Sequence, residues 1–164
     1  RVGCVGAKLL YPDDTIQHAG VGFGIGGVAG HLHKYFPATS DGYMGRLNYV
    51  QDVYGDTAAC LLIRKEIYDE VHGLDESYAV AFNDVDFCVR VREAGYTNVF
   101  TPFAQLYHYE SKSRGMEDRL AGAPCWPRAT PAPTPTLTSS VRTSASKFCL
   151  WSKADESFRM YCCL

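Results

Sequence analysis

The sequence contains no long apolar run, no CxxC pair of cysteines and no excess of basic residues. No stretch approaches the ~20 consecutive apolar residues of a membrane-spanning helix, so we expect no transmembrane segment. The formal net charge of -2 gives no reason to expect binding to nucleic acid, which normally needs a basic surface. None of the seven cysteines belongs to a CxxC pair, which argues against a zinc ribbon or a disulfide framework. The cysteine pattern favours the reducing environment of the cytoplasm.

The composition is that of a globular domain up to about Asp118 and changes after it. The chain has 164 residues, of which 46% are hydrophobic, enough for one domain with a core. It opens at Arg1 directly into an apolar run, from which we expect a piece of a larger domain. Five of the eight prolines lie in 124–135. We therefore expect a folded part over 1–118 and a disordered or out-of-frame tail over 121–164.

The hydrophobic patterns predict alternating strands and helices, and hence an α/β or α+β fold. Gly73 and Gly95 are typical of residues that end a helix, whereas the region 15–45 shows no sustained period and indicates mostly loop. The predicted elements are a strand over 4–12, a strand over 56–64, a helix over 65–73, a helix over 83–95 and two short strands in 96–103 and 104–110.

The glycine run GFGIGG matches GxGxxG through Gly22, Gly24 and Gly27, with Asp41 further on. A dinucleotide fingerprint should follow a buried strand and open a helix. The glycines that come next oppose a helix, so a loop near the functional surface is the better interpretation.

The histidines of the same region offer a second possibility. His31 and His33 alternate as residues on one strand face do, and His18 precedes them. Together they would make a small metal-binding module. No acid or cysteine stands at a helpful spacing, so ordinary polar loop histidines remain the alternative.

Asp84 and Asp86 lie where the helix over 83–95 should begin. An acid in the first turn is favoured by the helix dipole and by capping of the helix end. A carboxylate fixed there is also suited to act as a general base toward a hydroxyl. The residues themselves leave both interpretations open.

A third group of polar residues follows the last predicted strand. His108 ends it, and Lys112 and Arg114 come shortly after. Imidazole is a good ligand for a divalent ion, and the two cations are suited to phosphate oxygens. A histidine satisfied by neighbouring polar groups is the alternative.

In their order and spacing, three segments resemble family 2 glycosyltransferases of the GT-A fold, in the branch of rhamnosyltransferase-like and O-antigen enzymes. The segments are 5–21, 57–76 and 82–96, within a resemblance that extends over 2–118. It implies a partial GT-A fold without the N-terminal nucleotide-binding half. It also implies a cytoplasmic protein, free or peripheral at the inner face of the membrane.

The resemblance implies an inverting transfer of a sugar in the synthesis of bacterial polysaccharide. The partners would be a nucleotide-sugar donor and a glycan or lipid-linked acceptor. A divalent metal, Mg²⁺ or Mn²⁺, would be held mainly through the DxD motif of the nucleotide-binding half, which this chain lacks. Asp13 and Asp14 do not replace that motif, because they belong to the turn after the first matching strand.

The resemblance also assigns roles to residues of this chain. The family's acidic pair appears here as Asn83–Asp84, with asparagine in place of the usual glutamate, and Asp84 takes the role of general base. The other roles are those of a supporting acid for Asp86, a metal and donor ligand for His108, donor-phosphate contacts for Lys112 and Arg114, and an acceptor pocket for Thr57, Ala58, Ala59 and Cys60.

Three functions follow as hypotheses. The first is a glycosyltransferase with Asp84 as its base. The second is a non-catalytic remnant that folds partly, binds no donor and self-associates through unpaired strand edges. The third is the small metal-binding module of His18, His31 and His33.

Overall fold

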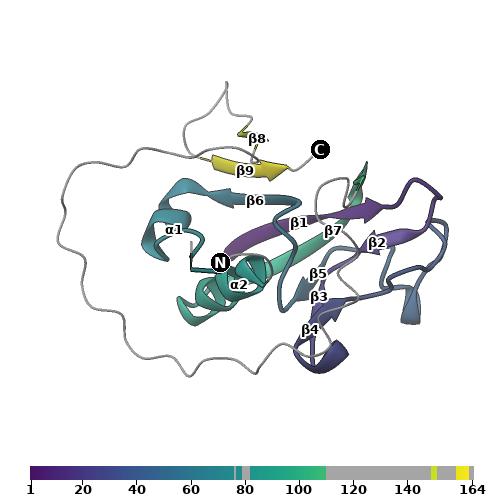
Figure 1. The fold of residues 1–164 in the computed structure, drawn as a ribbon, viewed down its shortest axis with the longest axis horizontal. Coiled ribbons are helices and arrows are strands. Elements are labelled where there is room, and N and C mark those ends of the chain that lie inside the picture. The colour runs from purple at the N-terminus through teal and green to yellow at the C-terminus, as the bar shows by residue number, and fades with distance from the viewer. Residues whose placement is uncertain (76, 79–81, 110–148, 151–157, 163–164) are drawn as a thin grey trace.

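A mixed sheet with two helices on one face forms the centre of the molecule (Figure 1). The computed structural model describes residues 1–75, 77–78, 82–109, 149–150 and 158–162. Within these residues the sheet has seven strands in the order β5-β7-β1-β6-β9-β8, with β2 also paired to β1. They are β1 Val2–Leu10, β2 Ile16–His18, β5 Gln51–Val53, β6 Cys60–Arg64, β7 Thr97–Tyr107, β8 Cys149–Leu150 and β9 Phe158–Cys162. This arrangement agrees with the predicted α/β class.

Strand β1 is the central strand and confirms the strand predicted over 4–12, displaced by two residues. It pairs in parallel with β7 and antiparallel with β6 and β2. Most of its residues are buried, as expected of a strand with neighbours on both edges.

Strand β6 is shorter than predicted. The strand expected over 56–64 begins only at Cys60, because 56–59 form a turn: the Cys60 amide donates to the Thr57 carbonyl at 3.4 Å, and the Ala59 amide donates to Thr57 Oγ1 at 3.3 Å. Within the strand Leu61 and Ile63 are buried and Leu62 is exposed. The turn leaves the backbone amide of Ala58 outside the ladder of β6.

Strand β7 corrects the prediction of two short strands over 96–103 and 104–110. On β1, Ala7 and Lys8 are adjacent, but their partners on β7 are Thr101 and Gln105. The three intervening residues, the first of them Pro102, therefore form a bulge. Proline has no amide to donate to a ladder, so its presence at a bulge is expected.

Helices α1 (Lys65–Glu70) and α2 (Asn83–Glu93) pack against the same face of β1 and β6 (Figure 1). They confirm the two predicted helices. Gly73 and Gly95, just beyond their ends, have φ of 67° and 85°, which glycine adopts without a steric penalty. The core between helices and sheet consists of Cys4, Leu61, Ile63, Ile67, Val71, Phe87, Cys88, Val91 and Tyr96.

The region 15–45 contains more regular structure than predicted. Besides β2 it forms β3 (Val21–Phe23) and β4 (Ala29–His31), with single 3₁₀ turns at Ile25–Gly27 and Tyr43–Gly45. Elements of three residues are too short to give a period in the sequence. The glycine run forms the loop of the β3–β4 hairpin, not a strand-to-helix turn, which agrees with the loop interpretation and not with a dinucleotide fingerprint.

Two pieces of the region 121–164 belong to the sheet. Strand β9 pairs antiparallel with β6, and β8 pairs with β9, so the expectation of a tail without packed elements does not extend to these strands. The remainder of that expectation lies outside the described residues. Among the helices that the structure describes, none has the length and apolar character needed to cross a membrane.

Candidate functional site

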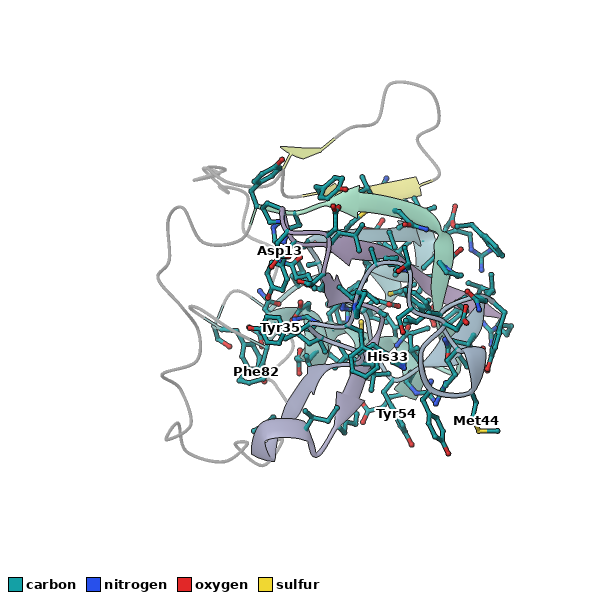
Figure 2. All side chains as sticks on the ribbon, turned by 90° about the vertical axis from the view of Figure 1, so that its right-hand side faces the viewer. Asp13, His33, Tyr35, Met44, Tyr54 and Phe82 are labelled. Atoms are coloured by element: carbon teal, nitrogen blue, oxygen red, sulfur yellow. The ribbon has the colours of Figure 1, made fainter. Side chains whose placement is uncertain are left out.

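The first turn of α2 presents Asp84, but neither Asn83 nor Asp84 caps the helix as predicted. The capping position belongs to Phe82, which has φ of 66° and lies at the edge of the described body (Figure 2). Its carbonyl accepts the Asp86 amide at 2.9 Å. Because the left-handed turn at Phe82 starts the helix, the Asp84 side chain is available for another contact.

The Asp84 carboxylate joins α2 to the turn before β6. Its Oδ2 accepts a hydrogen bond from the Ala58 amide at 3.2 Å, and its Oδ1 accepts one from the Val85 amide at 2.9 Å. The structure thus brings the predicted base together with the predicted acceptor pocket, Thr57 to Cys60, all four of which are half-buried. Each carboxylate oxygen has a second lone pair, so these bonds orient the carboxylate and leave it able to accept a proton.

Asp86 lies one residue beyond Val85 but faces a different partner. Its Oδ2 accepts from Arg90 Nε at 2.8 Å, and its Oδ1 accepts from the Tyr78 hydroxyl at 3.5 Å. Arg90 also donates to the carbonyl of Val71, at the end of α1. The contacts of Asp86 therefore connect the two helices, and its role as a supporting acid stays a prediction.

His108 lies next to β2 at the end of β7. Its amide donates to the Leu10 carbonyl at 2.9 Å, and its Nδ1 lies 2.8 Å from the Gln17 side-chain oxygen. An amide oxygen only accepts, so His108 Nδ1 carries the proton. Lys112 and Arg114, the predicted donor-phosphate contacts, lie outside the described residues.

Of the three histidines of the metal-module hypothesis, the structure brings together two. His18 and His31 have their Nδ1 atoms 2.8 Å apart, but His33 Nε2 accepts the amide of Tyr43 instead. Within the ranges described, no group of three His, Cys, Asp or Glu side chains could hold a metal ion.

The sequence interpretation missed Asp56, which is buried beside His18. His18 Nε2 and Asp56 Oδ1 are 3.3 Å apart, and both side chains are fully buried. Burial lowers the pKa of His18 to about 4; burial, and then the charge of Asp84, raise the pKa of Asp56 well above its usual value. The only sequence signal was an acid at the start of an otherwise small and apolar run.

Comparisons with known proteins connect the chain to polysaccharide enzymes. No family model matches it. It is 60% identical over 118 residues to the uncharacterized protein y4gI of Sinorhizobium fredii, covering 71% of this chain and 13% of that protein. It is 35% identical over 127 residues to the O-antigen biosynthesis protein RfbC of Myxococcus xanthus, covering 77% of this chain and 10% of that protein.

A third relative carries a more specific name. The N-acetylglucosaminyl-diphospho-decaprenol L-rhamnosyltransferase of Mycobacterium tuberculosis is 27% identical over 124 residues, covering 71% of this chain and 40% of that protein. The chain thus spans between 10% and 40% of the length of these relatives. The names of the two characterised relatives support a relationship to glycosyltransferases of O-antigen or cell-wall glycan synthesis.

Proposed function

We propose that the chain is the acceptor-side part of an inverting glycosyltransferase of the GT-A type, with Asp84 as the general base. The observation that carries the proposal is the hydrogen bond from the Ala58 amide to Asp84 Oδ2. It holds a half-buried carboxylate at a helix start, directly beside the small residues that the family resemblance assigns to the acceptor. The names of the relatives in O-antigen and rhamnose transfer support the same reaction class.

In the proposed step Asp84 accepts the proton of the acceptor hydroxyl. The hydroxyl oxygen forms a bond to C1 of the donor sugar from the face opposite the leaving group. The bond between C1 and the diphosphate oxygen breaks, and its electron pair leaves with the nucleoside diphosphate. A general base within hydrogen-bond reach of the hydroxyl typically contributes ~10²–10⁴ in rate. The proposal also requires Mg²⁺ or Mn²⁺ and a nucleotide-binding half with its DxD motif. None of these is among the residues that the structure describes.

The substitution Asp84→Asn in the full-length protein tests the proposal. It keeps the size of the side chain and an oxygen for the Ala58 amide, but it removes the basic carboxylate. We expect the rate of transfer to fall by a factor of ~10²–10⁴. The Kd for the nucleotide sugar, measured by calorimetry, should change by no more than a factor of about two, because the proposal directs Asp84 toward the acceptor.

Asp86→Asn is the matched control, since it changes the neighbouring acid on the same helix. We expect it to keep most of the transfer activity. If Asp84→Asn keeps more than a tenth of the activity and Asp86→Asn abolishes it, the base has been assigned to the wrong aspartate.

A further inference from the structure

Beneath the proposed site, His18 and Asp56 form a pair that no step of the reaction uses. Their side chains are fully buried and join at 3.3 Å through His18 Nε2 and Asp56 Oδ1. On its other side His18 meets His31 of the β3–β4 hairpin, with the two Nδ1 atoms 2.8 Å apart. A buried polar pair is costly unless its hydrogen bonds are made, so these contacts restrict the positions of both side chains.

The donors around His18 define where the protons lie. The Gly20 amide points at His18 Nε2 from 3.3 Å, so that nitrogen accepts and the ring proton is on Nδ1, which donates to His31. Asp56 Oδ1 lies at the same distance from Nε2, so a protonated Asp56 carboxyl and the Gly20 amide share the one lone pair of this nitrogen. The lowered pKa of His18 and the raised pKa of Asp56 favour the same neutral forms. The pair is therefore a neutral hydrogen bond, although its geometry also meets the distance criterion for an ion pair.

The backbone of Asp56 is hydrogen-bonded to the Cys88 thiol of α2. Its amide donates to Cys88 Sγ at 3.3 Å, and its carbonyl accepts from the same thiol at 3.5 Å. Its side chain lies against Gly6 of β1, where a Cβ would be only 2.1 Å from Asp56 Oδ1. Contacts with strands β1 and β2 and with helix α2 thus restrict the position of Asp56.

Two residues after Asp56 comes Ala58, whose amide binds the Asp84 carboxylate at 3.2 Å. Within the turn that contains Ala58, two further hydrogen bonds go to Thr57, and both are longer than 3.2 Å. Its position therefore depends on what holds its first residue. A displacement of about 1 Å at a reacting group is enough to change a rate on the order of 10²-fold.

We propose that His18 and Asp56 are positioning residues for Asp84: their buried hydrogen bond fixes the turn over 56–59, and the turn's Ala58 amide fixes the carboxylate. The consequence for catalysis rests on the proposed function of Asp84. The consequence for the Ala58 amide does not, because that hydrogen bond exists in this chain whatever reaction it serves.

Two substitutions that keep the branching at Cγ test the pair. Asp56→Asn keeps a side-chain donor for His18 Nε2, whereas Asp56→Leu has larger methyl groups and no polar atom. In the chain itself we expect hydrogen exchange of the Ala58 amide, followed by NMR, to accelerate on the order of 10-fold in Asp56→Leu and to change less than about twofold in Asp56→Asn. His33→Gln is the control, since His33 also binds a backbone amide, that of Tyr43, but does not belong to the pair.

In the full-length protein Asp56→Leu should lower kcat on the order of 10²-fold while the KM for the nucleotide sugar stays within about twofold. Asp56→Asn should retain the kcat of the unsubstituted protein, which a purely ionic pair would not allow. Unchanged Ala58 exchange in Asp56→Leu overturns the proposal, and so does equal acceleration in His33→Gln. If Asp84→Asn keeps its transfer rate, the proposed function of Asp84 is wrong. The exchange of the Ala58 amide then still tests the positioning role by itself.

If Asp56→Leu does not fold, Gly6→Ala is the second variant, because its methyl group crowds Asp56 without removing any polar atom. We expect faster Ala58 exchange in a folded Gly6→Ala protein. If both variants lose the fold, the pair serves folding alone and the positioning role is wrong.

Discussion

Asp86 and Arg90 form an ion pair of 2.8 Å within one turn of α2, and Arg90 continues from it to the carbonyl of Val71 at the end of α1. Both side chains are partly buried, with exposures of 15% for Asp86 and 28% for Arg90. An exposed pair at this spacing contributes only a few tenths of a kcal/mol. This pair is worth more because it also orients the guanidinium that joins the two helices.

We therefore expect Asp86→Asn to lower the free energy of unfolding by about 1–2 kcal/mol, since it weakens a charge-assisted hydrogen bond in a partly buried position. Urea unfolding of the chain measures this change. Asp69→Asn is the control, because Asp69 is an exposed acid of α1, and we expect it to stay within about 0.5 kcal/mol. Equal effects of the two substitutions would show that the Asp86–Arg90 pair does not connect the helices.

The His18–Asp56 pair predicts opposite pH dependences for two variants. The folded-state pKa of His18 is about 4, below its usual 6.5, so the unfolded chain binds more protons between these values and stability rises with pH there. The folded-state pKa of Asp56 is raised above 3.8, so the folded chain holds the extra proton and stability falls as pH rises above 3.8. In the native chain the two contributions oppose each other between about pH 4 and 6.5.

Each substitution should expose the contribution of the residue that remains. In Asp56→Asn, His18 is the one member of the pair that still titrates. We therefore expect the contribution of the pair to the free energy of unfolding to increase from pH 4 to 6.5, by at most about 1.4 kcal/mol per pH unit. With His18→Gln only Asp56 titrates, so we expect stability to decrease over the same range. Urea midpoints at several pH values measure both. The same sign of slope in the two variants would contradict a neutral pair.

His108 gives a prediction about metal. Gln17 accepts the Nδ1 proton of His108 at 2.8 Å, so Nε2 is the unprotonated nitrogen of the neutral ring. If His108 contacts the metal of the donor, His108→Ala in the full-length protein should raise the Mn²⁺ concentration needed for donor binding about 10-fold or more. Gln17→Ala should cause a smaller shift in the same direction, because the imidazole loses its orientation. A titration of donor binding against Mn²⁺ measures this.

His33→Ala is the control for these titrations, as His33 binds the Tyr43 amide in a separate loop. An unchanged Mn²⁺ requirement in His108→Ala would make His108 a structural partner of Gln17 only.

Local signals accounted for much of the fold. The apolar run of β1, the helical periods of α1 and α2, and the terminal glycines Gly73 and Gly95 all depend on residues close in the sequence, and each prediction was confirmed within a few residues. The roles of Asp84 and Ala58 in one site were implied by a family resemblance, not by any local pattern, and their contact was found only in the structure. No composition or period connects residues that are 26 positions apart.

The errors arose where distant segments decide the conformation. β7 was divided in two because its sequence does not show that both halves pair with β1 around one bulge. The sequence predicts a strand from residue 56 onward because most of the residues there are small or apolar, whereas in the structure Asp56 contacts β1, β2 and α2 and a turn follows it. The contact of Asp56 with His18 could not be predicted from the sequence for the same reason, because His18 lies 38 residues earlier.

Gly6 gives the last prediction, because its hydrogen atom faces the Asp56 carboxyl within the core. A Cβ there would lie 2.1 Å from Oδ1 and 2.2 Å from Cγ of Asp56. A contact that short must move either β1 or the buried carboxyl, and Asp56 is restricted by its bonds to His18 and Cys88. We expect Gly6→Ala to lower the free energy of unfolding by about 1–3 kcal/mol, the usual cost of overpacking a core.

Gly22→Ala is the matched control on strand β3. Its Cβ would meet the methyl ends of Ile25 and Leu32, each at 3.0 Å, with Leu32 Cγ at 3.7 Å. These are the ends of flexible side chains, and removal of a glycine from a strand reduces the entropy lost on folding. We expect its free energy of unfolding to change by less than about 1 kcal/mol. Thermal unfolding of both variants measures the difference. If Gly6→Ala were as stable as Gly22→Ala, Asp56 would have room to move, and the Ala58 turn could not depend on its position.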